Sequence, residues 1–263
     1  MRTKYLTLIV CILVASSMYA NVAITNGLTH IYKGNSGDVI SGEVILMNGS
    51  DQEQLVTFEL NEAIFSCETN RIFTNEYSHP KSSTDWFNGK VLNKVLGPKE
   101  KYVYTYTIEM PNDKSLRGSY WTVLKVNLEK PIREESINGN IGLDTKITYA
   151  VALLTHVNDY DELSLDFENI NLKEDAQNLK KELEVKLINN SLFIEGIKLS
   201  LEIYDNNGVK VHEGKTDRNL TFPGFCRDFL IDVSSLPNGK YECVLIADSR
   251  EEFIGTNISL TID

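Results

Sequence analysis

Two stretches of the sequence follow one plan and decide the fold. Residues 101–110 (KYVYTYTIEM) are followed by Pro111, a polar turn and Gly118-Ser119-Tyr120; residues 229–236 (FLIDVSSL) are followed by Pro237-Asn238-Gly239-Lys240-Tyr241. Pro and Asn-Gly segments favour turns at strand ends. A Tyr just after such a corner can bury its ring and hydrogen-bond its hydroxyl to the loop, as in the tyrosine corner of immunoglobulin-like sandwiches. The repeat therefore predicts two tandem β-sandwiches.

The strands expected around these corners are short, alternate in polarity and are separated by polar turns, which is typical of sandwiches. We expect an all-β protein with one immunoglobulin-like β-sandwich domain over residues 21–157 and a second over residues 158–263. Residues 21–32 are expected to form one first strand. Residues 172–187 are locally ambiguous, and we interpret them as a loop followed by a strand.

The first twenty residues have the pattern of a secretory signal peptide, with a basic start, an uncharged apolar stretch over residues 5–15 and Ala20 at the end. The apolar stretch is too short for a membrane span, which needs about 20 residues. Cys11 as a lipidation site is disfavoured, because it lies inside the apolar core after the bulky Val10. We expect an exported protein, in the periplasm or at the cell surface.

The charge of the chain is strongly negative, −11 over 263 residues. It becomes more negative without the basic residues of the signal peptide. This charge disfavours nucleic acid and anionic lipid as partners. No later stretch is apolar enough to span a bilayer.

Three cysteines remain after the signal peptide: Cys67, Cys226 and Cys243. An odd number excludes complete disulfide pairing. If the corner at Pro237 joins neighbouring antiparallel strands, Cys226 and Cys243 are offset by roughly 16 Å. A disulfide needs Cα atoms within about 7 Å. We therefore expect buried free thiols, although a corner that crosses between sheets would remove the geometric argument.

Residues 143–157 form the candidate partner-binding strand, because they are apolar on both faces. Tyr149, Val151 and Leu153 share one face. Such a strand is either covered on both sides or leaves an apolar row for a partner. Trp86, in the long irregular stretch 66–90, is a further candidate for binding a sugar or peptide. The alternative that we favour for Trp86 is a plug at the end of the sandwich.

No catalytic motif is present in the sequence: there is no Gly-x-Ser-x-Gly elbow, no His-Glu-x-x-His, no phosphate-binding glycine loop and no Cys-x-x-Cys. We expect no enzyme activity, no cofactor and no metal. Asp159, Asp161 and Glu162 in the predicted linker could hold calcium, but they provide fewer ligands than calcium needs, and a solvated acidic linker is favoured.

Residues 21–262 resemble the WxL-interacting cell-surface proteins of Gram-positive bacteria. The matching positions are Tyr32, Asn48, Asp85-Trp86, Leu96-Gly97-Pro98, Pro111, Gly118-Ser119-Tyr120-Trp121, Asn189-Asn190, Tyr204-Asp205-Asn206-Asn207-Gly208, Pro223 and Leu236-Pro237-Asn238-Gly239-Lys240-Tyr241. The resemblance implies a first domain linked to peptidoglycan and a second linked to partner proteins. That family also carries a C-terminal membrane helix, for which this sequence has no counterpart.

The layout is also similar to that of the periplasmic pilus chaperones, which have two immunoglobulin-like domains and bind subunits by adding a strand to an incomplete sandwich. Residues 143–157 lie where that strand is expected. Our main interpretation is an exported non-catalytic binding protein of the bacterial cell envelope that holds a protein partner or peptidoglycan. The alternative is a chaperone-like assembly factor that works by β-strand addition.

Overall fold

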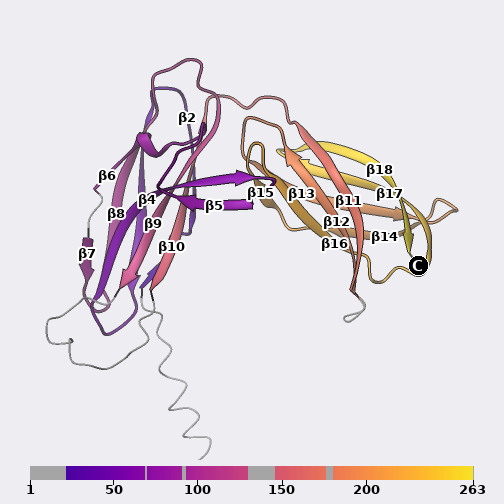
Figure 1. Ribbon diagram of the computed structural model, residues 1–263, viewed down its shortest axis with the longest axis horizontal. Coiled ribbons are helices and arrows are strands. Elements are labelled where there is room, and N and C mark those ends of the chain that lie inside the picture. The colour runs from indigo at the N-terminus through magenta and orange to yellow at the C-terminus, as the bar shows by residue number, and fades with distance from the viewer. Residues whose placement is uncertain (1–21, 69, 91–92, 130–145, 176–179, 263) are drawn as a thin grey trace, which may run out of the picture.

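The computed structural model describes residues 22–68, 70–90, 93–129, 146–175 and 180–262, so the predicted signal peptide lies outside the described residues. The described elements are strands and one 3-10 turn, η2 (Thr84–Trp86). They form two sandwiches that lie one after the other (Figure 1). The sheets of the first use strands between Val22 and Val157, and those of the second use strands between Leu165 and Ile262. Within these described parts, no helix is long and apolar enough to cross a membrane.

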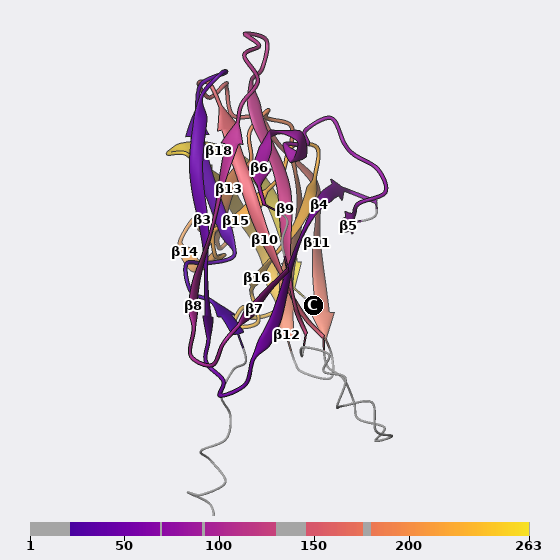
Figure 2. The same ribbon diagram turned by 90° about the vertical axis from the view of Figure 1, so that its left-hand side faces the viewer.

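The first sandwich packs a four-stranded sheet against a larger one (Figure 2). The four-stranded sheet has the order β1 (Val22–Ile24), β3 (Val39–Asn48), β8 (Lys101–Glu109) and β6 (Phe87–Gly89). The other sheet has the order β2 (Thr29–Gly34), β10 (Ile147–Val157), β9 (Gly118–Glu129), β4 (Gln54–Ser66) and β5 (Asn70–Thr74), with β7 (Asn93–Leu96) also paired to β4. Their facing side chains form one continuous apolar core.

The expected first strand is divided between the two sheets. β1 pairs antiparallel with β3, whereas β2 pairs parallel with β10. The chain changes sheet between them, at a turn in which Gly27 has φ +91°, a conformation that glycine adopts without strain. The single strand is therefore wrong, and Leu28 and Ile31, two of its apolar residues, are exposed.

The second sandwich has a three-stranded and a five-stranded sheet. The first has the order β11 (Leu165–Asp175), β12 (Lys180–Asn189) and β16 (Cys226–Asp232). The second has the order β14 (Lys210–Lys215), β13 (Glu195–Tyr204), β17 (Gly239–Ser249) and β18 (Glu252–Ile262), with β15 (Asn219–Thr221) also paired to β13.

The loop expected from residue 172 is wrong, because β11 continues to Asp175 and pairs with β12. Pairing with β12 decides the structure of residues 172–175, which the local sequence left ambiguous. β11 also has an earlier register shift, between Phe167 and Asn169. Phe167 precedes the shift, and Ile170 and Leu172 follow it, yet all three pack against the same core. A bulge adds one residue and reverses the alternation, so the sequence loses its strand periodicity while the strand continues.

Both corners carry the predicted tyrosine. The Tyr241 hydroxyl donates to the carbonyl of Pro237 over 2.8 Å, and the Tyr120 ring is buried against Trp86 with centroids 4.6 Å apart. Each corner carries the chain from one sheet of its sandwich to the other. Cys226 and Cys243 therefore lie in different sheets, and the offset argued for neighbouring strands does not apply to them.

A buried asparagine closes the turn after β3 in the first sandwich and after β12 in the second. Asn48 Nδ2 donates to the carbonyls of Gln52 and Gly97, both over 2.8 Å. Asn189 Nδ2 donates to those of Phe193 and Thr221, also over 2.8 Å. In each case the side-chain oxygen accepts the N–H two residues on. Both asparagines are fully buried, so these bonds satisfy amide groups that water does not reach.

We expect Asn189→Ala to lower the free energy of unfolding by at least about 2 kcal/mol, because it leaves buried carbonyls without donors. The exposed neighbour provides the control: Asn190→Ala removes a surface bond to Asp166 and should change stability by less than about 0.5 kcal/mol. Urea unfolding followed by tyrosine fluorescence measures both. Equal effects would show that burial of the amide is unimportant.

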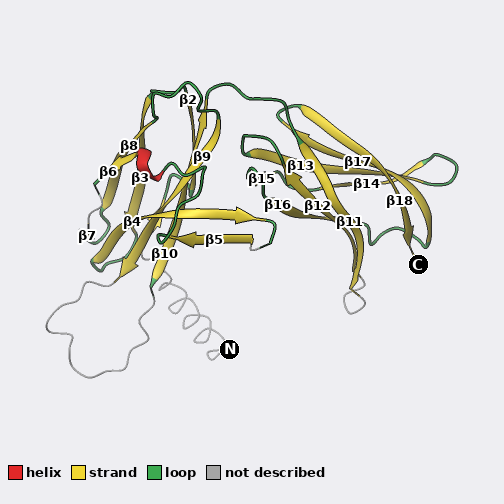
Figure 3. Cartoon of the chain, turned by 45° about the horizontal axis from the view of Figure 1, so that its top comes forward, coloured by secondary structure: helices red, strands yellow, loops and turns green. Residues whose placement is uncertain are grey.

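A disulfide joins the two sandwiches, and the expectation of free thiols is wrong for two of the three cysteines. Cys67 and Cys226 are bonded with Cα atoms 4.7 Å apart, and Cys243 is a buried free thiol. Cys67 follows β4, which extends with β5 as a hairpin beyond the first sandwich towards the second (Figure 3). The sequence separation of 159 residues hides this pairing, because no local pattern connects the hairpin tip with β16.

Because Cys67 and Cys226 are bonded, we expect one reactive thiol, Cys243, when the chain without residues 1–20 is unfolded without a reductant. Alkylation in denaturant followed by mass spectrometry should label Cys243 alone. The double variant Cys67→Ser/Cys226→Ser should lose about 3–5 kcal/mol of stability, since a long loop is no longer closed in the unfolded state. Labelling of three thiols would contradict the crosslink.

Candidate functional site

The edge of β10 is the first candidate site, because only part of this strand has neighbours on both sides. β9 pairs with β10 along its whole length, from Ile147 to Val157. β2 pairs with it only from Ala152 onward. Residues 147–151 therefore form a sheet edge with no described strand beside them.

The hydrogen-bonding groups on this edge can be assigned. The Ala152 N–H donates to the carbonyl of Leu28 over 2.9 Å, so this residue directs its backbone groups away from β9. Successive residues of a strand direct these groups to opposite sides. The N–H and C=O groups of Thr148 and Ala150 therefore face the open edge, which is the arrangement that a further strand needs for pairing.

Of the predicted partner-binding side chains of β10, two are fully buried and the third, Tyr149, is half-buried. Val151 and Leu153 are fully buried in the core of the first sandwich. Tyr149 packs against the same core, and its hydroxyl donates to the carbonyl of Val22 over 2.8 Å. The interpretation of this face as an apolar row for a partner needs correction, because the opposite sheet already covers it. The binding group that this strand offers is its backbone.

Trp86 is also buried, with 8% of its surface exposed. It lies in η2, and its ring packs against Tyr120 with centroids 4.6 Å apart. It belongs to the core cluster of the first sandwich. This position agrees with a plug at the end of the sandwich, and the structure does not bring Trp86 together with the edge of β10.

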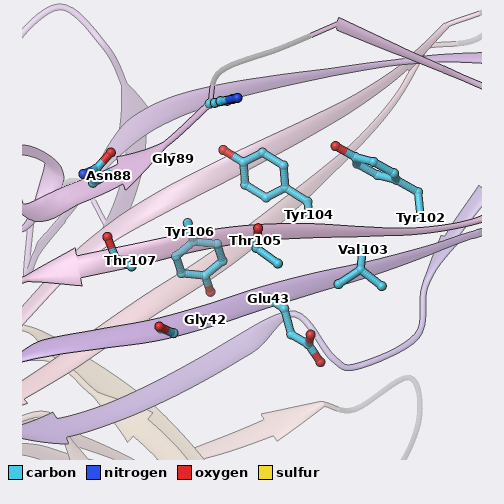
Figure 4. Close-up of a pocket in the computed structure, with 12 residues that line it drawn as sticks. Gly42, Glu43, Asn88, Gly89, Tyr102, Val103, Tyr104, Thr105, Tyr106 and Thr107 are labelled. Atoms are coloured by element: carbon cyan, nitrogen blue, oxygen red, sulfur yellow. The ribbon is translucent and has the colours of Figure 1, made fainter.

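A surface groove lies beside β8 and is lined by residues of β3, β6 and β8 (Figure 4). Its volume is about 760 Å³. It exists because β6 pairs only with Tyr106, Thr107 and Ile108 and then ends at Gly89. The hydroxyl of Tyr104 is buried beside Gly89 and has no hydrogen-bond partner among the described residues. The groove is open, its lining is polar and apolar in similar measure, and it belongs to the sheet opposite β10.

The junction between the sandwiches has its own apolar cluster. Trp121 and Ala63 of the first sandwich pack with Ile194, Phe222 and Phe225 of the second. The Trp121 indole N–H donates to the carbonyl of Ala63 over 2.6 Å. The two sandwiches are therefore joined by side-chain packing as well as by the disulfide.

Polar groups at the junction are paired across it. The Ser119 hydroxyl accepts the Ile194 N–H over 2.7 Å, so its own proton points to His156 Nδ1, also 2.7 Å away. This geometry leaves the ring proton of His156 on Nε2. Burial, with a smaller contribution from Lys33, lowers the pKa of His156 to about 4. The imidazole is therefore neutral at pH 7, and protonation would remove the acceptor that orients Ser119.

The acidic linker is held by arginines from both sandwiches. Arg117 donates to the carbonyls of Asp159 and Tyr160 over 2.9 and 2.8 Å. Arg250 donates to the carbonyl of Asp161 over 3.1 Å, and its Nε pairs with the buried Glu195 at 3.0 Å. Groups of three or more acidic, His or Cys side chains arranged to hold a metal do not occur among the described residues. These arginines bind backbone carbonyls of the linker and not the carboxylates of Asp159, Asp161 and Glu162.

His156 predicts a pH dependence of stability. Its folded pKa lies below the value of about 6.5 for an unfolded histidine. Between these two values the unfolded chain binds a proton that the folded chain does not, so stability falls as the pH falls from about 6.5 to 4, by about 3 kcal/mol. His156→Gln should lack this part of the decrease. Urea unfolding at pH 7.5 and 5 measures the difference; identical profiles would contradict it.

Comparison with known proteins shows similarity in structure alone: no protein-family model and no curated protein matches the sequence. The class 5 fimbriae chaperone CfaA is 15% identical, with a TM-score of 0.50 over 91% of this chain and 98% of that one. A chain of a chaperone–tip adhesin complex of CFA/I fimbriae is 14% identical, with a TM-score of 0.47 over 91% and 98%. A chain of the Salmonella enterica SafA pilin–SafB chaperone complex is 10% identical, with a TM-score of 0.45 over 94% and 98%.

At 15% identity, the similarity to CfaA is a similarity of fold alone. The comparisons do not support the resemblance to WxL-interacting proteins. CfaA is a fimbrial chaperone, and the pilus chaperones are the second family that the sequence resembles. The chain thus has two immunoglobulin-like β-sandwiches, and it shares this fold with a fimbrial chaperone.

Proposed function

We propose that the protein is an exported, non-catalytic binding protein that captures a partner protein by β-strand addition to β10. The observation that carries the proposal is the open edge of β10, where Thr148 and Ala150 direct their backbone groups away from β9 and no described strand pairs with them. An added strand obtains affinity from such main-chain bonds, and specificity from the pockets that receive alternate side chains.

The surroundings of this edge favour an extended apolar segment of a partner. Ile147 and Tyr149 are partly buried at the rim of the core. A strand that pairs with Thr148 and Ala150 places every second side chain over this rim. Those side chains would extend the core, whereas the intervening ones would face away from it.

The neighbouring structures agree with a protein partner. Two of the similar structures are complexes of a chaperone with a tip adhesin or a pilin. Peptidoglycan, the other partner expected from the sequence, has no support from these comparisons. Export to the periplasm or the cell surface remains part of the proposal and depends on the sequence pattern of residues 1–20.

A proline at the edge tests the proposal. Thr148→Pro removes an N–H that faces the open side and leaves the bonds to β9 in place, since this residue directs its groups outward. We expect at least tenfold less partner in a native pull-down from the cell envelope, because one lost bond and the proline ring oppose strand pairing. Thr148→Val is the matched control: it keeps the backbone and loses only the side-chain bond to Asn127. Equal capture by both variants would refute strand addition here.

Amide hydrogen exchange gives a second readout, which does not depend on a variant. In the free protein the Ala152 amide, which is bonded to Leu28, should exchange slowly, and those of Thr148 and Ala150 should exchange fast. Addition of the purified partner should slow both fast amides. Binding without any such protection would place the partner elsewhere on the protein.

A further inference from the structure

A second cavity lies at the junction of the two sandwiches, on the face of β10 and β9 that points away from the core. Its volume is about 350 Å³. Its walls are mostly apolar and come from both sandwiches: Ala150, Ala152 and Trp121 from the first, and Leu220 and Phe222 from the second. We call this space the junction cleft.

Two arginines line this apolar cleft, one from each sandwich. Arg71 lies on β5, in the hairpin that reaches the second sandwich, with its guanidinium 6.0 Å from the ring centre of Phe65 and 5.9 Å from that of Phe73. Arg227 lies on β16, next to the disulfide-bonded Cys226. The disulfide therefore holds the two guanidinium-bearing strands together at the mouth of the cleft.

Neither guanidinium has a carboxylate partner among the described residues. Arg227 makes one side-chain bond, from Nη1 to Asn219 Oδ1 over 2.9 Å, and its Nε is buried without an acceptor. Glu168 contacts Cys226 but pairs with Lys186 at 3.7 Å. The chain as a whole has 37 acidic and 26 basic residues, so two unpaired arginines side by side are unusual for it.

The position of Arg227 on its strand strengthens this point. It pairs with Leu187, on the same face of the sheet as the core residues Phe229 and Ile231. This face is apolar along the rest of the strand, and a charge there has an unfavourable desolvation energy unless an opposite charge accompanies it. Arg71 is a second positive charge close to Arg227. Burial and, to a smaller extent, this charge lower the pKa of Arg227. An anion between the two arginines would offset both the desolvation of Arg227 and its repulsion from Arg71.

We propose that the junction cleft binds a small amphipathic carboxylate, with its anionic head between Arg71 and Arg227 and its hydrocarbon body against Trp121, Phe222 and Ala152. Guanidinium groups form paired, charge-assisted bonds with a carboxylate. The apolar walls exclude an inorganic ion as the complete ligand, because such an ion would leave them without contact. This inference is independent of strand addition, which uses the edge of β10 and not its outward face.

Calorimetric titration of the full, oxidised protein with decanoate, below its micelle-forming concentration, tests the proposal. We expect saturable binding, at least tenfold weaker binding to Arg71→Gln or Arg227→Gln, and at least tenfold weaker binding of decan-1-ol to the unchanged protein. Arg218→Gln is the control, because Arg218 is an exposed arginine of the second sandwich that pairs with Asp248 outside the cleft; this variant should bind decanoate normally.

Each other outcome overturns the inference. Equal affinity for decanoate and decan-1-ol would show an apolar cavity without an anion site, and unchanged affinity in both arginine variants would place the anion elsewhere. Thermal unfolding of each variant verifies the fold, and Arg71, which is exposed, can be replaced without disturbing the core. Loss of decanoate binding in Thr148→Pro would show that the cleft and the strand edge are one site.

Discussion

Backbone pairing of β10 is the constraint on which the first sandwich and its proposed function depend. A buried strand needs partners for its N–H and C=O groups on both sides. β9 supplies them on one side, and β2 supplies them on the other only as far as Ala152. The cause lies in the first strand, which is shared between the sheets so that β1 completes β3. In the part of the chain that the structure describes, this arrangement closes the core and leaves residues 147–151 without a second strand beside them.

The junction is the second constraint, and it uses three kinds of interaction. Apolar side chains around Trp121 exclude water, buried polar groups around Ser119 and His156 pair across the boundary, and the disulfide joins the hairpin to β16. The apolar packing and the disulfide both join the hairpin of β4 and β5 to the second sandwich. The junction cleft and its two arginines are products of this arrangement, since each sandwich contributes one guanidinium.

The candidate site could be predicted only in part. Strand alternation placed Tyr149, Val151 and Leu153 on one face correctly, but an apolar face has the same pattern whether a partner or the opposite sheet covers it. The unpaired groups are the backbone N–H and C=O of Thr148 and Ala150. Every residue has such groups, so the sequence does not indicate which of them lack a partner strand. Arg71 and Arg227 carried no signal either, because they come from distant parts of the chain and meet only through the hairpin and the disulfide.

The sequence by itself determined the local features of this protein: the all-β class and the two tyrosine corners at Tyr120 and Tyr241. Each depends on residues close together in the chain, where turn chemistry and alternation act directly. Tertiary structure decided the sharing of the first strand, the partner of Cys67 and the junction cleft. Each of these depends on which distant segments lie side by side, and that is set by the packing of whole sheets.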